Sequence, residues 1–137
     1  MLASMFQTTT IPVLEEMVNF TQARHTVLTG NIANLDTPGY QARDLSVEDF
    51  QGRLKEAIAQ RNEAAEPRSP GAPPSPEGPM LAEVAKSAQA ILRHDQGNVN
   101  VESQVSEMVK NQMEHNMALS IMVSQFRLLQ TAIAGKV

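Results

Sequence analysis

The side chains in this sequence that could do chemistry are few and widely spaced. The three histidines stand at positions 25, 94 and 115, and there is no cysteine. None of the histidines is followed four residues later by a second one, the spacing that places two metal ligands on one helix face. No nucleophile elbow, phosphate-binding loop or paired-carboxylate pattern is present. The sequence therefore predicts no enzyme, no metal site and no cofactor.

Composition narrows the function classes further. The net charge is -4, and the eleven Lys and Arg residues are spread singly, so no basic stripe predicts nucleic-acid binding. Hydrophobic residues make up 42% of the chain, which is too many for a disordered protein, yet there are only four Phe, one Tyr and no Trp. Residues 115–134 are interrupted by Ser, Gln and Arg127, so we do not predict a membrane span. The N-terminus lacks the basic and apolar regions of a cleavable secretion signal.

Proline divides the chain into two arms. Residues 62–80 carry most of the prolines, and because proline removes a backbone donor this segment is predicted to be an extended linker. The predicted organisation is a helical N-terminal arm (1–36), a turn with a short amphipathic helix (37–61), the linker (62–80), a variable connector (81–99) and a long C-terminal helix (100–137).

Both arms show the three-and-four spacing of a coiled-coil seam. In the first arm the seam comprises Ile11, Leu14, Val18, Thr21, His25, Leu28, Ile32 and Leu35. In the second it comprises Val101, Val105, Met108, Gln112, His115, Leu119, Met122, Phe126, Leu129 and Ile133, with Asn100 as a helix cap. We therefore predict an all-α fold in which the two arms pair. The seam histidines, His25 and His115, either set the register or form a metal or pH-sensitive pair, and we favour the first.

Local signals set the ends of the shorter elements. Pro38 and Gly39 suit the central positions of a type II turn, so the first helix should stop near Leu35. Ser46 is the predicted N-cap of the next helix, with Leu45 and Phe50 in contact across the cap. Residues 81–99 could form a helix or a hairpin, and the sequence does not decide between them.

The predicted C-terminal helix would be about 50 Å long, which is too long for a compact globule of this mass. Between His115 and Ala134 its only charge is Arg127, so the helix is apolar on several sides. Two paired helices cannot bury all of that surface. We therefore expect a subunit completed by other copies or by homologous chains.

The segment Leu28–Tyr40, which reads LTGNIANLDTPGY, resembles the signature of the axial proteins of the bacterial flagellum, the rod, hook and hook-associated proteins. The resemblance covers roughly residues 10–50 and 90–135, and the small size is most similar to a rod protein. It marks an assembly motif made of Asn31, Ile32, Ala33, Asn34, Thr37, Pro38, Gly39, Tyr40, Arg43 and Asp44. In physical terms, Asn31 and Asn34 could cap helix carbonyls or bridge to another chain, and Tyr40 is expected to point at a neighbour.

The resemblance implies a structural subunit of the proximal rod, between the MS ring and the distal rod and hook. Implied partners are other copies, other rod proteins, FliE, MS-ring components and the type III export apparatus, and the implied location is the periplasmic rod, reached without a cleavable signal. No nucleic acid or small-molecule substrate is expected. The alternative is a helical adaptor or export chaperone, which would form a discrete dimer.

Overall fold

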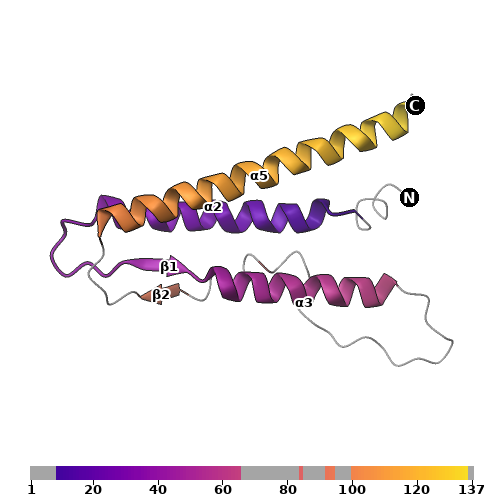
Figure 1. The fold of residues 1–137 in the computed structure, drawn as a ribbon. Coiled ribbons are helices and arrows are strands. Elements are labelled where there is room, and N and C mark those ends of the chain that lie inside the picture. The colour runs from indigo at the N-terminus through magenta and orange to yellow at the C-terminus, as the bar shows by residue number, and fades with distance from the viewer. Residues whose placement is uncertain (1–8, 66–83, 85–91, 95–99, 136–137) are drawn as a thin grey trace.

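The computed structural model describes residues 9–65, 84, 92–94 and 100–135. Within them, the chain forms helices α2 (Ile11–Ala33), α3 (Val47–Ala65) and α5 (Val101–Ala134), and strands β1 (Arg43–Leu45) and β2 (Leu92–His94). Helix α2 lies in the middle, with α5 along one side and α3 with the strands along the other (Figure 1). The predicted all-α fold with paired terminal helices is confirmed.

The strands form one small antiparallel pair in which Asp44 lies opposite Arg93. Strand β2 falls within residues 81–99, where helix and hairpin were both open. Its partner is β1, which precedes the proline-rich segment, so the pairing joins distant parts of the chain. Most of the predicted linker and connector lies outside the described residues.

Local capping explains where α3 and α5 begin. The Ser46 hydroxyl accepts a hydrogen bond from the Asp49 backbone N–H at 3.2 Å, as predicted. The Asn100 side chain accepts one from the Glu102 N–H, also at 3.2 Å. Helix α3 continues to Ala65, past the predicted end at residue 61, because residues 62–65 contain no proline and two alanines.

Helix α2 ends at Ala33, and Leu35, predicted as a seam residue, lies beyond it. The turn that follows has the predicted form. The Tyr40 N–H donates to the Thr37 carbonyl at 3.1 Å, and Gly39 has a φ of 77°, as position i+2 of a type II turn requires.

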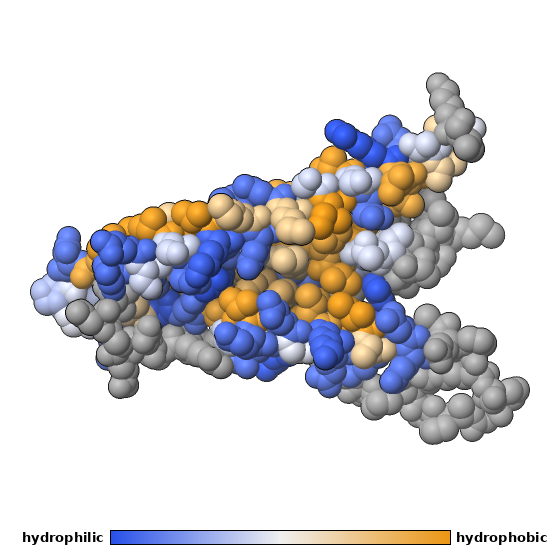
Figure 2. Space-filling model, viewed as in Figure 1, coloured by the Kyte–Doolittle hydropathy of each residue, from blue (hydrophilic) through white to orange (hydrophobic). Residues whose placement is uncertain are grey.

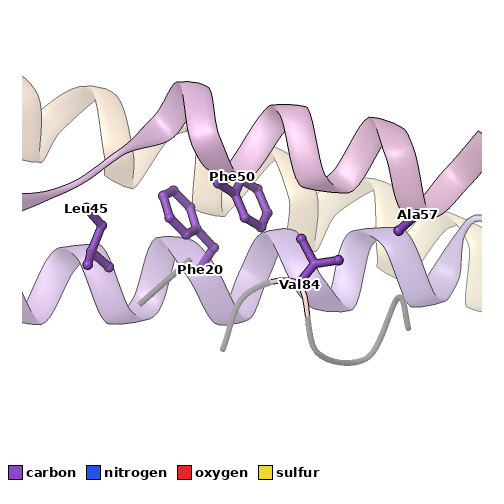
Figure 3. Close-up of a cluster of buried hydrophobic side chains, with 5 residues drawn as sticks. All are labelled: Phe20, Leu45, Phe50, Ala57 and Val84. Carbon is purple, nitrogen blue, oxygen red and sulfur yellow. The ribbon is translucent and has the colours of Figure 1, made fainter. Parts of the chain in front are cut away.

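The buried cluster lies between α2 and α3. The rings of Phe20 and Phe50 are stacked, with centroids 4.0 Å apart and an interplanar angle of 6°, and Leu45, Ala57 and Val84 complete the cluster (Figure 3). Leu45 and Phe50 therefore share one core, as the predicted contact across the cap requires. At the far end of α3, Arg61 donates to the Thr9 carbonyl at 3.1 Å.

Two glycine substitutions should have opposite effects on stability. An added Cβ would meet no atom within 4 Å at Gly39 or at Gly52, so only the backbone conformation differs. Gly39→Ala places a side chain at positive φ and should lower the free energy of unfolding by about 1–2 kcal/mol. Gly52→Ala, inside α3, should raise it by about 0.5–1 kcal/mol. Urea unfolding followed by circular dichroism measures both, and a shift of the same sign in the two variants would contradict the assigned turn.

Candidate assembly interface

The side chain of Asn31 joins three elements at the end of α2. Its Nδ2 donates to the Arg43 carbonyl at 2.6 Å and to Gln104 Oε1 at 2.9 Å. Its Oδ1 accepts from the Arg43 N–H at 3.0 Å and from the Tyr40 hydroxyl at 3.1 Å. Asn31 is only 1% exposed, and all four hydrogen-bonding positions of its amide are used. It therefore fixes the turn and β1 against α2 and α5.

This geometry divides the predicted assembly motif into an inner and an outer part. Asn34 caps the helix by donating to the Gly30 carbonyl at 2.8 Å, one of the two predicted uses. Tyr40 bonds Asn31 in its own chain, so the prediction that it points at a neighbour is wrong. The reason is that the turn brings its hydroxyl back over the helix end.

The outer part of the motif faces solvent in the single chain. Its exposed residues are Ala33, Thr37, Pro38, Gly39 and Arg43, while Ile32 is half-buried. These side chains remain free to contact another subunit.

An ion cluster beside Asn31 was not predicted as a unit. The buried Arg24 guanidinium donates to both carboxylate oxygens of Asp44, at 2.9 and 2.7 Å, and to Glu107 at 3.0 Å. Glu107 also accepts from Lys110 at 2.7 Å. The two carboxylates raise the pKa of Arg24 further above its usual range, because they stabilise its charge. Of these residues, the predicted assembly motif contains only Asp44, because nothing in the local spacing of Arg24 or Glu107 indicates that they are ion-pair partners.

A third polar contact lies farther along the two helices. Thr21 Oγ1 is 2.9 Å from His115 Nδ1, and Asn111 Nδ2 donates to the Thr21 carbonyl at 2.8 Å. A pair between His25 and His115 is not found, since His115 is matched with Thr21 and His25 Nδ1 is buried without a partner. Among the described residues, no group of three His, Asp or Glu side chains is placed to hold a metal ion.

These contacts show that α5 is turned relative to the prediction. The face of α5 toward α2 contains Gln104, Met108, Asn111, His115, Ala118, Met122, Gln125 and Leu129, all buried or half-buried. Of the predicted seam, only Met108, His115, Met122 and Leu129 belong to that face. The predicted seam also contains four residues outside this face: Val105, Leu119, Phe126 and Ile133. Their exposed fractions are 40%, 39%, 46% and 71%, respectively. In α2 the prediction holds better, since Leu14 and Leu28 are buried and Val18 is half-buried.

The physical reason is the polar surface that α2 presents. Arg24, Thr21 and Asn31 are buried there, and each needs a hydrogen-bonding partner. Gln104, Glu107 and Asn111 supply those partners only if α5 turns its polar side inward. Ala118, 1% exposed, lets the helices approach closely farther along. Most of the predicted seam, including Val105, Leu119, Phe126 and Ile133, is thereby left on the outside.

Every strongly exposed large hydrophobic side chain among the described residues belongs to α5. Figure 2 shows apolar side chains on the surface of this helix. By length and composition, α5 is also apolar enough to cross a membrane. We interpret its surface as protein-facing, because its first half satisfies polar groups of α2 and carries Glu102, Glu107, Lys110 and Glu114.

Comparison with known proteins gives this surface a context. No family model matches the chain. The flagellar basal body rod protein FlgB of Bacillus subtilis strain 168 is 29% identical over 126 residues, 92% of this chain and 94% of the relative. The FlgB of Salmonella typhimurium strain LT2 is 27% identical over 127 residues, 88% and 90% of the two chains. The FlgB of Aeromonas hydrophila is 32% identical over 114 residues, 82% of this chain and 83% of the relative. The chain belongs to the FlgB family.

Membership of the FlgB family confirms the resemblance found in Leu28–Tyr40. The chain is a component of the flagellar basal body rod. FlgB proteins are named as rod proteins and not as enzymes. The polar contacts around Asn31 and Arg24 are therefore interpreted as structural, because they hold the turn, β1 and α5 against α2. The exposed face of α5 is the candidate surface for contacts with other subunits.

Loss of the Asn31 amide should destabilise the subunit more than loss of the Asn34 amide. Asn31→Ala leaves several partly buried groups without these partners and should lower the free energy of unfolding by about 2–4 kcal/mol. Asn34→Ala removes one helix-capping bond and should cost about 0.5–1 kcal/mol. Urea unfolding of both variants measures the difference. Equal losses of unfolding free energy would show that the hydrogen bonds of Asn31 are no more important to the fold than that of Asn34.

The ion cluster should make the helix pair sensitive to acid. The hydrogen bond from Lys110, with help from Arg24, lowers the pKa of Glu107 below its ordinary value of 4.5. A carboxyl group whose pKa is lower in the folded than in the unfolded chain stabilises the fold at every pH above its unfolded pKa. This stabilisation is lost as the pH falls through the folded pKa. The free energy of unfolding should therefore decrease below about pH 4.5, and it should decrease less steeply in the Glu107→Gln variant.

Unfolding free energies of the wild type and Glu107→Gln, measured between pH 7 and about pH 3, test this. Glu63→Gln, which changes an exposed carboxylate on α3, is the matched control and should retain the wild-type slope. An unchanged slope in Glu107→Gln would rule out the assigned linkage.

Proposed function

We propose that this chain is a structural subunit of the proximal rod, where it connects the MS ring to the distal rod and hook and transmits torque. The observation that carries the proposal is the location of the exposed apolar surface. In the part of the chain that the structure describes, eleven large hydrophobic side chains are exposed, and all of them lie on α5. A helix that turns a polar side to its own chain and apolar sides outward is suited to bind other subunits.

The energetics favour assembly over an isolated fold. Burying one large aliphatic side chain is worth about 1.5–3 kcal/mol before entropy is subtracted, so α5 retains much unused binding energy. The polar contacts to α2 contribute only about 0.5–1.5 kcal/mol each. Most of the cohesion of α5 therefore comes from neighbours. Torque would be carried by many such contacts acting together.

The partners proposed are other copies of this chain, other rod proteins, FliE and MS-ring components, and the flagellar type III export apparatus. The proposed location is the periplasmic part of the rod, reached without a cleavable signal. The FlgB family of the relatives and the assembly motif support these assignments. The outward residues of the motif, among them Thr37, Pro38 and Arg43, are proposed to contact the next subunit.

A helical adaptor or export chaperone is the competing function. It would also be acidic and self-associating, but it would form a discrete dimer. Analytical sedimentation separates the two, because a rod subunit is expected as a monomer at low concentration and as an open polymer at high concentration. A dimer that stays unchanged over a wide concentration range would favour the chaperone.

A charge on the exposed apolar surface should block rod assembly without unfolding the subunit. Leu119 is 39% exposed, so Leu119→Asp should preserve the monomer's circular dichroism while burying an unpaired carboxylate in the assembly. We expect loss of swimming and of rods in isolated basal bodies. Gln51→Asp, on the exposed side of α3, is the control and should swim normally. Normal motility of Leu119→Asp would contradict the proposed role of α5.

A further inference from the structure

A polar cleft of about 410 Å³ lies where β1 and the start of α3 come close to the middle of α5. Arg24 of α2 belongs to its lining. The other polar residues that line it are Asp44, Ser46 and Glu48 from β1 and the start of α3, and Glu107, Lys110 and Glu114 from α5. None of the exposed apolar side chains of α5 takes part. The cleft is therefore a second surface, separate from the apolar one.

Arg24 brings an unused hydrogen-bond donor to this cleft. Its side chain is 6% exposed, and its Nε and Nη2 atoms donate to Asp44 and Glu107. Its Nη1 atom makes no hydrogen bond with any residue that the structure describes. In that part of the chain, the fully buried side-chain atoms without a partner are His25 Nδ1 and Asn111 Oδ1, so Nη1 retains some access to solvent. It can therefore donate to an acceptor that enters the cleft.

The charges around the cleft disfavour an anion as that acceptor. Four carboxylates and two cations line it, so negative charge is in excess. Asp44 and Glu107 are already paired with Arg24, and Glu107 also with Lys110. Glu114 makes no hydrogen bond or ion pair with any described residue, and Glu48 accepts one hydrogen bond, of 3.3 Å, from Ser46. The excess charge therefore belongs to Glu48 on α3 and Glu114 on α5.

We propose that the cleft binds an extended basic segment of a different protein of the rod. A backbone carbonyl of that segment accepts a hydrogen bond from Arg24 Nη1, and its Lys or Arg side chains lie against Glu48 and Glu114. An extended segment meets both requirements, because its carbonyls are free while its side chains carry positive charge. The inference rests on the proposed rod function and adds to it the chemistry of one partner.

The sequence argues against a second copy of this chain as the occupant. Its eleven Lys and Arg residues are spread singly, and the two nearest to each other in sequence are Arg53 and Lys55. Both lie inside helix α3, where the backbone carbonyls accept hydrogen bonds within the helix. A segment with neighbouring cations and free carbonyls therefore belongs to another protein.

Photo-cross-linking in flagellated cells tests the inference. The full chain carries the photoreactive residue p-benzoylphenylalanine in place of Lys110, and basal bodies are isolated after irradiation. The Lys110 side chain is 63% exposed, and its loss removes a positive charge from the cleft, so binding of a basic segment should not be weakened. The expected cross-link joins a different protein, at a segment in which Lys or Arg residues lie close together.

A charge reversal tests whether the carboxylates attract the segment. Adding Glu114→Lys should lower the cross-link yield at least about threefold, because an attractive charge pair becomes a repulsive one. The free energy of unfolding should hardly change, since Glu114 has no partner to lose among the described residues. Glu56→Lys, on the exposed side of α3, is the matched control and should retain the original yield.

Four results would each overturn the inference: cross-links only to copies of this chain, cross-links to segments without Lys or Arg, an unchanged yield in Glu114→Lys, or no cross-link at all. Recovery of the wild type in isolated basal bodies is scored separately. Its absence there would refute the proposed function, whereas its presence together with any of the four results refutes this partner alone.

Discussion

The polar contact between α2 and α5 determines what the rest of the molecule can present. Arg24, Thr21 and Asn31 are buried in α2, and a buried polar group without a partner costs about 1–3 kcal/mol. Each of them has partners within α2, β1 or the turn, and α5 completes the set by turning Gln104, Glu107 and Asn111 inward. This orientation leaves most of the predicted seam of α5, such as Leu119 and Phe126, outside the chain's own core. The surface available to other subunits is thus set by hydrogen bonds inside the subunit.

The same contact couples the turn after α2 to the helix pair. Asn31 bonds both Arg43 in β1 and Gln104 in α5, and Arg24 bonds both Asp44 and Glu107. The turn, the strand and α5 therefore share two anchors on α2. A displacement of α5 must disturb one of these anchors, so the outward part of the motif and the face of α5 keep a fixed relation. Such coupling suits a subunit whose surfaces contact different neighbours.

The features of the fold that could be predicted from the sequence are those controlled by local interactions. The Ser46 cap, the turn at Gly39 and the bounds of α5 depend on residues within a few positions, and all three were predictable. Prediction failed where distant groups decide. Hydrophobic spacing places Leu119 in the seam, but the partners of Asn111 and Glu107 lie on α2, far away in sequence. The pairing of strand β2 with β1 was missed for the same reason, whereas the inward direction of Tyr40 depends on Asn31, nine residues earlier on the other side of the turn.

The polar contacts between α2 and α5 and the exposed apolar side chains of α5 have two different tasks. Hydrogen bonds are directional, so Asn31 and Arg24 select one setting of α5 among several that apolar packing alone would allow. Apolar burial is stronger in total but less selective. Within the subunit it forms the cluster around Phe20 and Phe50, and the exposed apolar side chains of α5 are proposed to be buried by neighbours. One hydrogen-bonding group in the contact between α2 and α5 has no partner, since Asn111 Oδ1 is buried without one. A subunit built this way sets the orientation of α5 by itself, and in the proposed assembly it would gain further stability from its neighbours.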